Sequence, residues 1–286
     1  MIDVQRVGHS RDILGEYPVW SSQAHLLYWA DTHRPAVRRY DPERRQTMTW
    51  PMLEPVGSLA LRGTGGLLVG LGTHIAHYDP TIGSLGELAA PADRPAALRF
   101  QDGRCDRNGR FWAGAVDGTD PAGILYRVDG EGCTIAADTI PGPKGIAWGL
   151  DDRTMYVGDP QARTIFAYDF DVEAGTLGAR RVFAEIEAPG LPNGTTVDAE
   201  GFLWCAIRDG WRLMRFAPDG RVDRVVDLPV QGPTSCTFGG AGLATLYVTT
   251  AMEGLTKEQL ADQPLAGGLL ALDVGVKGVP EASYAS

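Results

Sequence analysis

Lysine is scarce in this sequence. Only Lys144, Lys257 and Lys277 are present, against 23 arginines. Basic residues as a whole are also outnumbered, because 26 Lys and Arg face 36 Asp and Glu and give a formal net charge of −10. Nucleic acids and anionic membranes are bound through basic patches, so this balance argues against both as partners. We expect a small-molecule substrate and, by default for an acidic chain, a monomer.

Cysteines and long apolar runs are few. Cys105, Cys133, Cys205 and Cys236 lie far apart, so no CxxC pair supports a zinc site or a redox motif. We expect four buried free thiols in a cytoplasmic protein, because disulfides belong to oxidising compartments. No apolar run reaches the roughly 18 residues of a membrane span. The segment MIDVQRVGHSRDILGE also lacks the apolar stretch of a signal peptide.

Glycine, proline and short strand-like runs are abundant instead. The chain holds 37 Gly and 19 Pro, and runs such as LLYWAD (26–31), TMYVGD (154–159) and TLYVTT (245–250) each follow a turn-like segment. The residues that end the first strand of each unit lie 41, 44, 43, 49 and 41 residues apart; they are Trp20, Leu61, Cys105, Trp148, Val197 and Phe238. A period of 40–50 residues with about four strands per unit is typical of a β-propeller.

We therefore predict an all-β fold, a six-bladed β-propeller with about four antiparallel strands per blade, as a single domain over residues 1–286. A two-sheet sandwich is the alternative, but it does not predict six recurring units. Residues 1–14 are expected to add a strand to the last blade and close the ring without a free edge. Residues 255–263 are expected to form a short amphipathic helix.

The first strand of each propeller blade lines the central channel, so residues at the strand starts converge at one mouth. These starts read GEYPVW (15–20), PVGSLAL (55–61), RFQDGRC (99–105), PKGIAW (143–148), PNGTTVD (192–198) and PTSCTF (233–238). Polar side chains that meet there form a natural small-molecule site.

The motifs LGEYPVW, RFQDGRCDRNGRFWAG, KGIAW, NGTTVDAEGFLW and PTSCTFGG together resemble the regucalcin/gluconolactonase/luciferin-regenerating-enzyme family over nearly the whole chain. The resemblance implies a six-bladed propeller and lactone hydrolysis assisted by one divalent metal. In that family the metal ligands are the glutamate of GExPVW, the asparagine of NGxAW and the aspartate of DGxxVD, which is also the usual candidate for the general base.

Only one of these three ligands is retained here. The glutamate is Glu16, but Lys144 stands at the asparagine position and Asn193 at the aspartate position. The substrate-binding RxND stretch of the family corresponds to Arg99–Asp102, with Gln101 where asparagine is usual.

The departure from the family pattern predicts a site that is free of metal or holds a metal only weakly, with no other cofactor. Calcium and magnesium need several oxygen ligands, usually with carboxylates among them. An ammonium about 4 Å from a dication costs roughly 8 kcal/mol at an effective dielectric constant of 20. We expect the ammonium of Lys144 to take part of the metal's space and to pair with Glu16.

Each candidate residue has a structural alternative to its functional role. Lys144 is either a catalytic group or a neutralising partner of Glu16 in a scaffold. Arg99 either clamps the substrate or, with Asp102, ties neighbouring strands. Tyr17 either shapes the mouth of the channel or packs in the core.

Three functions stay open, of which we favour the first. In lactone or ester hydrolysis, Lys144 stabilises the oxyanion, Glu16 activates water and Asn193 completes the catalytic group, with Tyr17, Arg99, Gln101 and Asp102 around the substrate. In a lyase, aldolase, cyclase or isomerase, Lys144 forms a Schiff base and must be neutral. In a binding propeller without catalysis, Tyr17 or other side chains block the channel.

Overall fold

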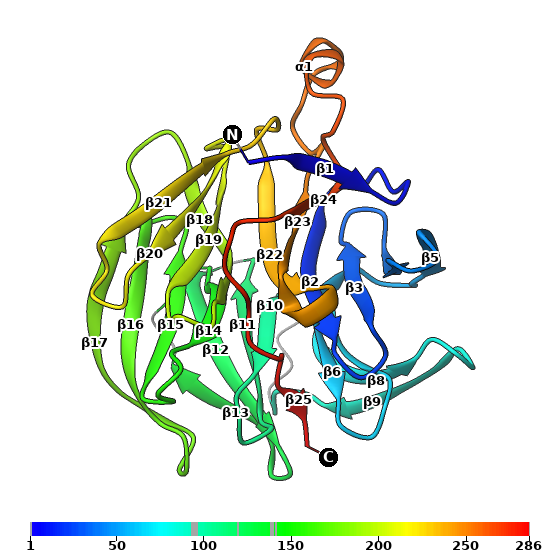
Figure 1. Ribbon diagram of the computed structural model, residues 1–286. Coiled ribbons are helices and arrows are strands. Elements are labelled where there is room, and N and C mark those ends of the chain that lie inside the picture. The colour runs from blue at the N-terminus through cyan, green and yellow to red at the C-terminus, as the bar shows by residue number, and fades with distance from the viewer. Residues whose placement is uncertain (1, 93–96, 119, 138–139, 141, 286) are drawn as a thin grey trace.

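The computed structural model describes residues 2–92, 97–118, 120–137, 140 and 142–285. Six antiparallel sheets stand around a common axis, which confirms the predicted six-bladed propeller (Figure 1). The innermost strands are β2 (Gly15–Ser21), β6 (Val56–Arg62), β10 (Leu98–Cys105), β14 (Lys144–Trp148), β18 (Leu191–Val197) and β22 (Pro233–Gly239). All six residues that set the sequence period lie in the last two positions of these strands.

Three further strands complete each blade outward from the axis. The second strands are β3 (Leu26–Asp31), β7 (Leu67–Leu71), β11 (Phe111–Asp117), β15 (Thr154–Asp159), β19 (Leu203–Arg208) and β23 (Thr245–Thr250). The third strands are β4 (Ala36–Asp41), β8 (His74–Asp79), β12 (Asp120–Asp129), β16 (Thr164–Asp171), β20 (Arg212–Phe216) and β24 (Leu269–Leu272). The outermost strands are β5 (Gln46–Pro51), β9 (Ser84–Ala89), β13 (Gly132–Ala137), β17 (Thr176–Glu185), β21 (Val222–Asp227) and β1 (Val4–Val7).

The last blade joins the N-terminal strand to three strands from the later part of the sequence, as predicted. Strand β1 pairs antiparallel with β24, from Val4 opposite Leu272 to Val7 opposite Leu269. The helix α1 (Lys257–Asp262) lies in the connection between β23 and β24, and Figure 1 shows it projecting at the end of the molecule opposite the C-terminus. Thr256 caps it through a capping box with Gln259. A 3₁₀ turn, η1 (Ala241–Leu243), connects β22 to β23.

Buried aspartates fix the core of three blades. In each, a carboxylate accepts a hydrogen bond from an indole Nε1 and pairs with an arginine, so no charge is buried without a partner. The three groups are Asp12 with Trp29 at 2.8 Å and Arg38 at 2.5 Å, Asp106 with Trp112 at 2.9 Å and Arg110 at 2.7 Å, and Asp198 with Trp204 at 2.9 Å and Arg215 at 2.8 Å.

Every innermost strand carries a β-bulge. The strand pairings skip between Glu16 and Val19, Val56 and Ser58, Gln101 and Gly103, Lys144 and Ala147, Pro192 and Thr195, and Pro233 and Ser235. One extra residue in each strand interrupts the pairing and redirects the local side chains. Six of the seven predicted site residues lie at these bulges or directly before them; only Arg99 does not.

The C-terminal segment packs against the inner strands at the end of the channel away from Lys144 and Glu16. Strand β25 (Ser283–Tyr284) pairs in parallel with β6, so blade two has five strands. Glu281 reaches Arg104 of blade three at 3.3 Å and accepts a hydrogen bond from Thr237 of blade six at 3.0 Å. Tyr284 is 2% exposed in the core between blades two and three. The segment 277–285, called the C-terminal tail below, therefore contacts inner strands of three blades.

The cysteines differ in one respect from the prediction. All four are free, and Cys105, Cys205 and Cys236 are buried. Cys133 is only partly buried, because it lies on the outermost strand β13, where one face of the sheet is open to solvent. Within the described part of the chain, no helix has the length and apolarity needed to span a membrane.

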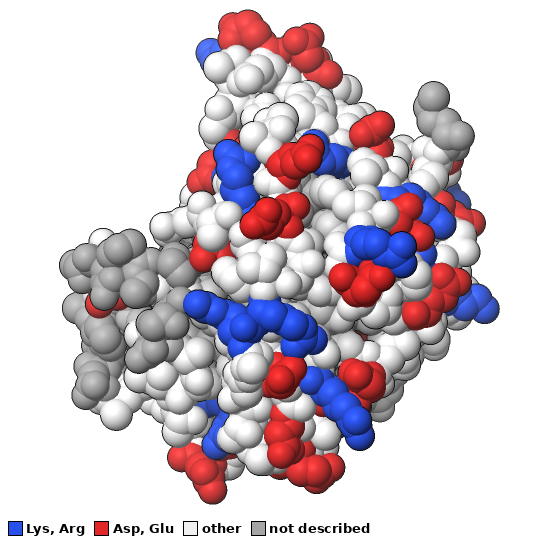
Figure 2. Space-filling model, turned by 90° about the vertical axis from the view of Figure 1, so that its left-hand side faces the viewer, with Lys and Arg blue, Asp and Glu red and all other residues white. Residues whose placement is uncertain are grey.

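The outer wall seen in Figure 2 carries acidic and basic side chains interspersed with one another. On strand β17, Arg181 pairs with Asp169 of β16 at 2.7 Å, with both side chains more than half exposed. Such exposed pairs contribute little to stability. This face therefore offers mixed charge and no continuous basic surface.

Candidate active site

Lys144 and Glu16 lie side by side. The Nζ atom of Lys144 is 2.9 Å from Oε1 of Glu16, and the two side chains are 13% and 1% exposed. Lys144 is the first residue of β14 in blade four, and Glu16 the second of β2 in blade one. The bulge that follows each residue brings the two side chains together from different blades. The ion pair expected from the sequence is present in the structure.

Burial and mutual attraction set the charge states of this pair. Burial raises the pKa of Glu16, against the opposing effect of the Lys144 ammonium. For Lys144, burial would lower the pKa, but the charge of Glu16 and its hydrogen bond to the ammonium outweigh burial and raise the pKa. Lys144 therefore carries its proton at neutral pH. A protonated amine is the form that stabilises an oxyanion, whereas a Schiff base needs the neutral form.

Tyr17 forms the surface beneath the lysine. Its ring centroid lies 5.5 Å from Nζ of Lys144, close enough for a cation–π contact, and the residue is 6% exposed. Its φ of 57° is in the left-handed region, which a bulky residue adopts only where its surroundings hold it. Burial also raises the pKa of the phenol, so Tyr17 stays neutral.

Asp102 connects the bulges of blades three and four. Its carboxylate accepts hydrogen bonds from the backbone N–H of Gly103 at 2.8 Å and from that of Gly145, the residue after Lys144. Its φ of 54° is again left-handed. These contacts favour the strand-tying role for Asp102. Gln101 extends toward the same segment, because a Cβ atom added to Gly142, two residues before Lys144, would lie 3.3 Å from Nε2 of Gln101.

Asn193 lies on the bulge of blade five, beside Gly145. Thr195 of the same strand donates a hydrogen bond to the carbonyl oxygen of Gly145 at 2.7 Å, which locks blades four and five together. Asn193 is 3% exposed, and its Oδ1 atom is buried without a hydrogen-bond partner among the described residues. A buried amide oxygen without a partner is costly, so a ligand or a water that donates a hydrogen bond would be favoured there.

Arg99 is less buried than the other candidate residues. Its side chain is exposed, and its guanidinium donates to the carbonyl oxygen of Leu98 at 2.6 Å. This contact is within its own strand and gives no information on substrate binding. The substrate-clamping role of Arg99 stays a prediction.

A second charged group near Glu16 was not identified from the sequence. Arg208, at the end of β19, pairs with Glu253 of the connection that carries α1, and Glu253 also meets Nδ1 of His33 at 2.8 Å. Arg208 and Glu16 act on each other's pKa: Arg208 opposes the burial effect on Glu16, and Glu16 helps to raise the pKa of Arg208 against burial. No local motif marks these residues, because they come from three different blades.

The donor set at Glu16 does not fit a divalent cation. The Lys144 ammonium is within hydrogen-bond distance of the Glu16 carboxylate. Asp102 is near enough to affect the pKa of Glu16, but its carboxylate accepts hydrogen bonds from two backbone N–H groups. Within the described ranges, no group of three or more His, Cys, Asp and Glu residues is arranged to hold a metal ion. A dication would have to displace the Lys144 ammonium or lie against its charge. That the candidate site works without a metal stays a prediction.

Solved structures with the same fold are found over the full length of the chain. A calcium-binding protein named regucalcin from Agrobacterium tumefaciens superposes with a TM-score of 0.94 at 22% identity, over 99% of this chain and 97% of that one. A luciferin-regenerating enzyme superposes with a TM-score of 0.91 at 26% identity over the whole of both chains. Both superpositions place the chain in one structural class, the six-bladed propeller.

Sequence comparison then gives the family. Residues 14–252 match the SMP-30/Gluconolactonase/LRE-like region, and the chain belongs to this family. It is 37% identical to the 6-deoxy-6-sulfogluconolactonase of Pseudomonas putida, over 96% of this chain and 95% of that protein. It is 33% identical to regucalcin of Gallus gallus over 99% of both. The family resemblance predicted from the motifs is confirmed, and it supports a lactonase-type hydrolase at the level of the family.

Proposed function

We propose that this protein hydrolyses a small sugar lactone without a divalent metal, with Lys144 in place of the metal as the stabiliser of negative charge. The observation that carries the proposal is the buried contact of 2.9 Å between Nζ of Lys144 and Oε1 of Glu16. The substrate class comes from relatives named for lactone hydrolysis, among them the 6-deoxy-6-sulfogluconolactonase and a gluconolactonase from Xanthomonas campestris with the same fold.

The two charged groups supply complementary parts of the reaction. An ammonium has three N–H donors, so Lys144 keeps two for the lactone carbonyl oxygen while one remains on Glu16. Negative charge that develops on this oxygen is stabilised by the fixed cation. Glu16 accepts the proton of the attacking water, and burial, by raising the pKa of Glu16, makes its carboxylate a stronger base than a solvated one.

Ring opening completes the cycle. When the tetrahedral intermediate collapses, the ring C–O bond breaks and the leaving alkoxide takes the proton that Glu16 had received from water. The product is a hydroxy acid, and Glu16 returns to its ionised form. In this proposal Asn193 accepts a hydrogen bond from a substrate hydroxyl, and Tyr17 supports the lysine through its ring. The support is the Oδ1 atom of Asn193, which has no partner among the described residues, and the cation–π contact of Tyr17.

The raised pKa of Lys144 argues against the Schiff-base alternative, because the amine is protonated at neutral pH. The binding-propeller alternative has one supporting observation. Tyr17 is 6% exposed and its ring centroid lies 5.5 Å from Nζ of Lys144, so its side chain takes up space beside the lysine. The side chain of Lys144 is still 13% exposed. An experiment decides between catalysis by Lys144 and binding without catalysis.

The decisive experiment is a hydrolysis assay over a panel of five- and six-membered aldonolactones, with enzyme treated with a chelator. We expect turnover that the chelator does not change and that Lys144→Met abolishes. The matched control is Lys257→Met, which makes the same substitution at an exposed lysine on α1. Saturable binding of a lactone without turnover would establish the binding propeller instead.

A further inference from the structure

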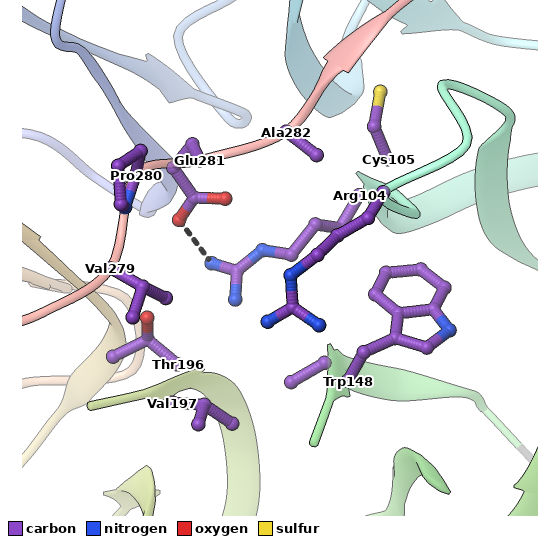
Figure 3. Close-up of a pocket in the computed structure, with 11 residues that line it drawn as sticks. Arg104, Cys105, Trp148, Thr196, Val197, Val279, Pro280, Glu281 and Ala282 are labelled. Atoms are coloured by element: carbon purple, nitrogen blue, oxygen red, sulfur yellow. Dashed lines mark ion pairs between the residues drawn. The ribbon is translucent and has the colours of Figure 1, made fainter. Parts of the chain in front are cut away.

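A polar cavity, separate from the group around Lys144, lies between the inner strands and the C-terminal tail. It has a volume of about 40 Å³, and its lining includes Arg104, Arg107, Trp148, Thr196, Val279 and Glu281. In Figure 3, the Arg104 side chain reaches toward Glu281, and Thr196 lies on the other side of its guanidinium. None of these residues belongs to the group around Lys144.

Arg104 is short of acceptors in this cavity. Its side chain is 16% exposed, and within the described ranges its one ion-pair partner is Glu281, at 3.3 Å from Nη2 and itself 9% exposed. A guanidinium has five N–H donors. The Glu281 carboxylate is also shared, because its Oε1 atom accepts a hydrogen bond from Thr237. Most donors of Arg104 are therefore left to the contents of the cavity.

A second guanidinium lines the same space. Arg107 is 35% exposed and uses Nη1 for the carbonyl oxygen of Gly149 at 2.8 Å and for the carboxylate of Asp152. Among the residues that the structure describes, each guanidinium has one carboxylate partner, Glu281 for Arg104 and Asp152 for Arg107, and N–H donors beyond that pair. About 40 Å³ is room for roughly three waters or for one small oxyanion.

We propose that this cavity binds one small oxyanion, such as phosphate, sulfate or a carboxylate, between Arg104 and Arg107 under the C-terminal tail. The planar fork of a guanidinium matches two oxygens of such an anion, which an isolated water cannot provide. The hydroxyl of Thr196 is a further donor on the cavity wall. The site is independent of the proposed lactone hydrolysis, since it shares no residue with it.

Calorimetric titration of the protein with sodium phosphate tests this site, with sodium chloride added to hold the ionic strength constant. We expect saturable binding with one anion per chain, and a melting temperature that rises with phosphate as linkage requires. Parallel titrations with sulfate and acetate separate tetrahedral oxyanions from carboxylates.

Variants locate the binding. Arg104→Met is expected to weaken phosphate binding at least 10-fold, the size of a lost charged hydrogen bond. Arg107→Met, at the more exposed position, is expected to weaken it several-fold and serves if Arg104→Met does not fold. Glu281→Gln is expected to tighten binding, because it removes a competing carboxylate. Arg181→Met, the same change of charge on the outer wall, is the control and leaves binding unchanged.

Two results would overturn the proposal. One is the lack of any saturable binding of the three anions, which would mean that the cavity holds only water. The other is phosphate binding that survives in Arg104→Met and Arg107→Met but is lost in Lys144→Met, which would place the anion at the candidate active site.

Discussion

The ammonium nitrogen of Lys144 touches the carboxylate of Glu16 across 128 residues of sequence. The two residues start the inner strands of blades four and one, so no local interaction brings them together. The closed ring of blades does so, and the pair forms only when the propeller is complete. The chemistry proposed here therefore depends on the whole fold.

Replacement of Lys144 by Met or Arg distinguishes a role for its positive charge from a role as a nucleophile. Lys144→Met is expected to lower kcat/KM for lactone hydrolysis roughly 10²–10³-fold, the size of a lost oxyanion donor. Lys144→Arg keeps a cation and is expected to retain part of the activity. The measurement is initial-rate kinetics on the best lactone of the panel. If Arg is as inactive as Met, and borohydride with substrate adds the substrate mass to the protein, the lysine is a Schiff-base nucleophile.

Replacement of Glu16 is expected to affect both catalysis and the charge of Lys144. Glu16→Gln removes the proton acceptor, and it also removes the anion that raises the pKa of Lys144. Only weaker effects such as that of Asp102 then oppose burial, so that pKa falls and the neutral amine appears at lower pH than in the wild type. An amine-reactive acylating reagent followed by mass spectrometry measures this. Equal rates of Lys144 labelling in the two proteins at every pH would contradict the ion-pair interpretation.

Restoring the ligands typical of the family is expected to create a metal site. In Lys144→Asn/Asn193→Asp, the ammonium is gone and a second carboxylate joins Glu16, which suits calcium. Calorimetry is expected to show one calcium ion per chain in the double variant and none in the wild type. The single variant Asn193→Asp, which keeps Lys144, is the control and is expected not to bind. Stoichiometric calcium binding by the wild type would show that the charge argument is wrong.

Gly145 is expected to tolerate no side chain. Its φ is +61°, and a Cβ atom would overlap the carbonyl oxygen of Asn193 and lie 2.8 Å from Cγ2 of Thr195. We expect Gly145→Ala to lower the free energy of unfolding by about 1–3 kcal/mol more than a control with the same backbone strain. That control is Gly275→Ala, with φ +74° and open space around it. Urea unfolding measures the difference, and equal losses would argue against a tight contact between blades four and five.

Asp12 is expected to make the stability depend on pH. Burial raises its pKa from 3.8 to about 6, although Arg38 opposes the rise. A raised pKa means that the native state holds the proton more tightly than the unfolded state, so stability falls as the pH rises from about 4 to about 6. The shift corresponds to roughly 3 kcal/mol.

Comparison with Asp12→Asn isolates this effect. Asn keeps an oxygen for the indole of Trp29 and does not titrate, and Arg38 keeps a second carboxylate, Asp31, at 3.5 Å. Urea unfolding between pH 4 and 7 is expected to show the wild type losing stability relative to the variant. Parallel pH curves for the two proteins would exclude Asp12 as the cause.

The fold could be predicted from the sequence because each blade repeats the same local signals. Turn residues, a β-rich run and a spacing of 41–49 residues recur at Trp20, Leu61 and the four later positions. Lys144 and Asn193 could be placed for a related reason, since both interrupt motifs that are otherwise intact. Periodicity and the position of a residue within a motif are properties of short segments, so both can be read from a single sequence.

The rest of the site depends on contacts between blades, which a single sequence does not display. Arg208, Glu253 and His33 meet through the ends of second strands and a long connection, with no shared spacing. The bulges were not predicted either, because an extra residue is visible only against the partner strand. The two backbone N–H groups that bind the Asp102 carboxylate were not predicted either, and its role toward a substrate stays a prediction.

The ring of six bulges separates the reactive groups from the framework that carries them. Residues at a bulge lie outside the regular cross-strand pairing, so one side chain can be exchanged there without repacking a sheet. The family resemblance implies two such exchanges, at Lys144 and Asn193. A library of variants that changes only the bulge positions would sample new reactions on a constant scaffold. The risk of misfolding would be confined to positions such as Gly145, where the backbone itself is crowded.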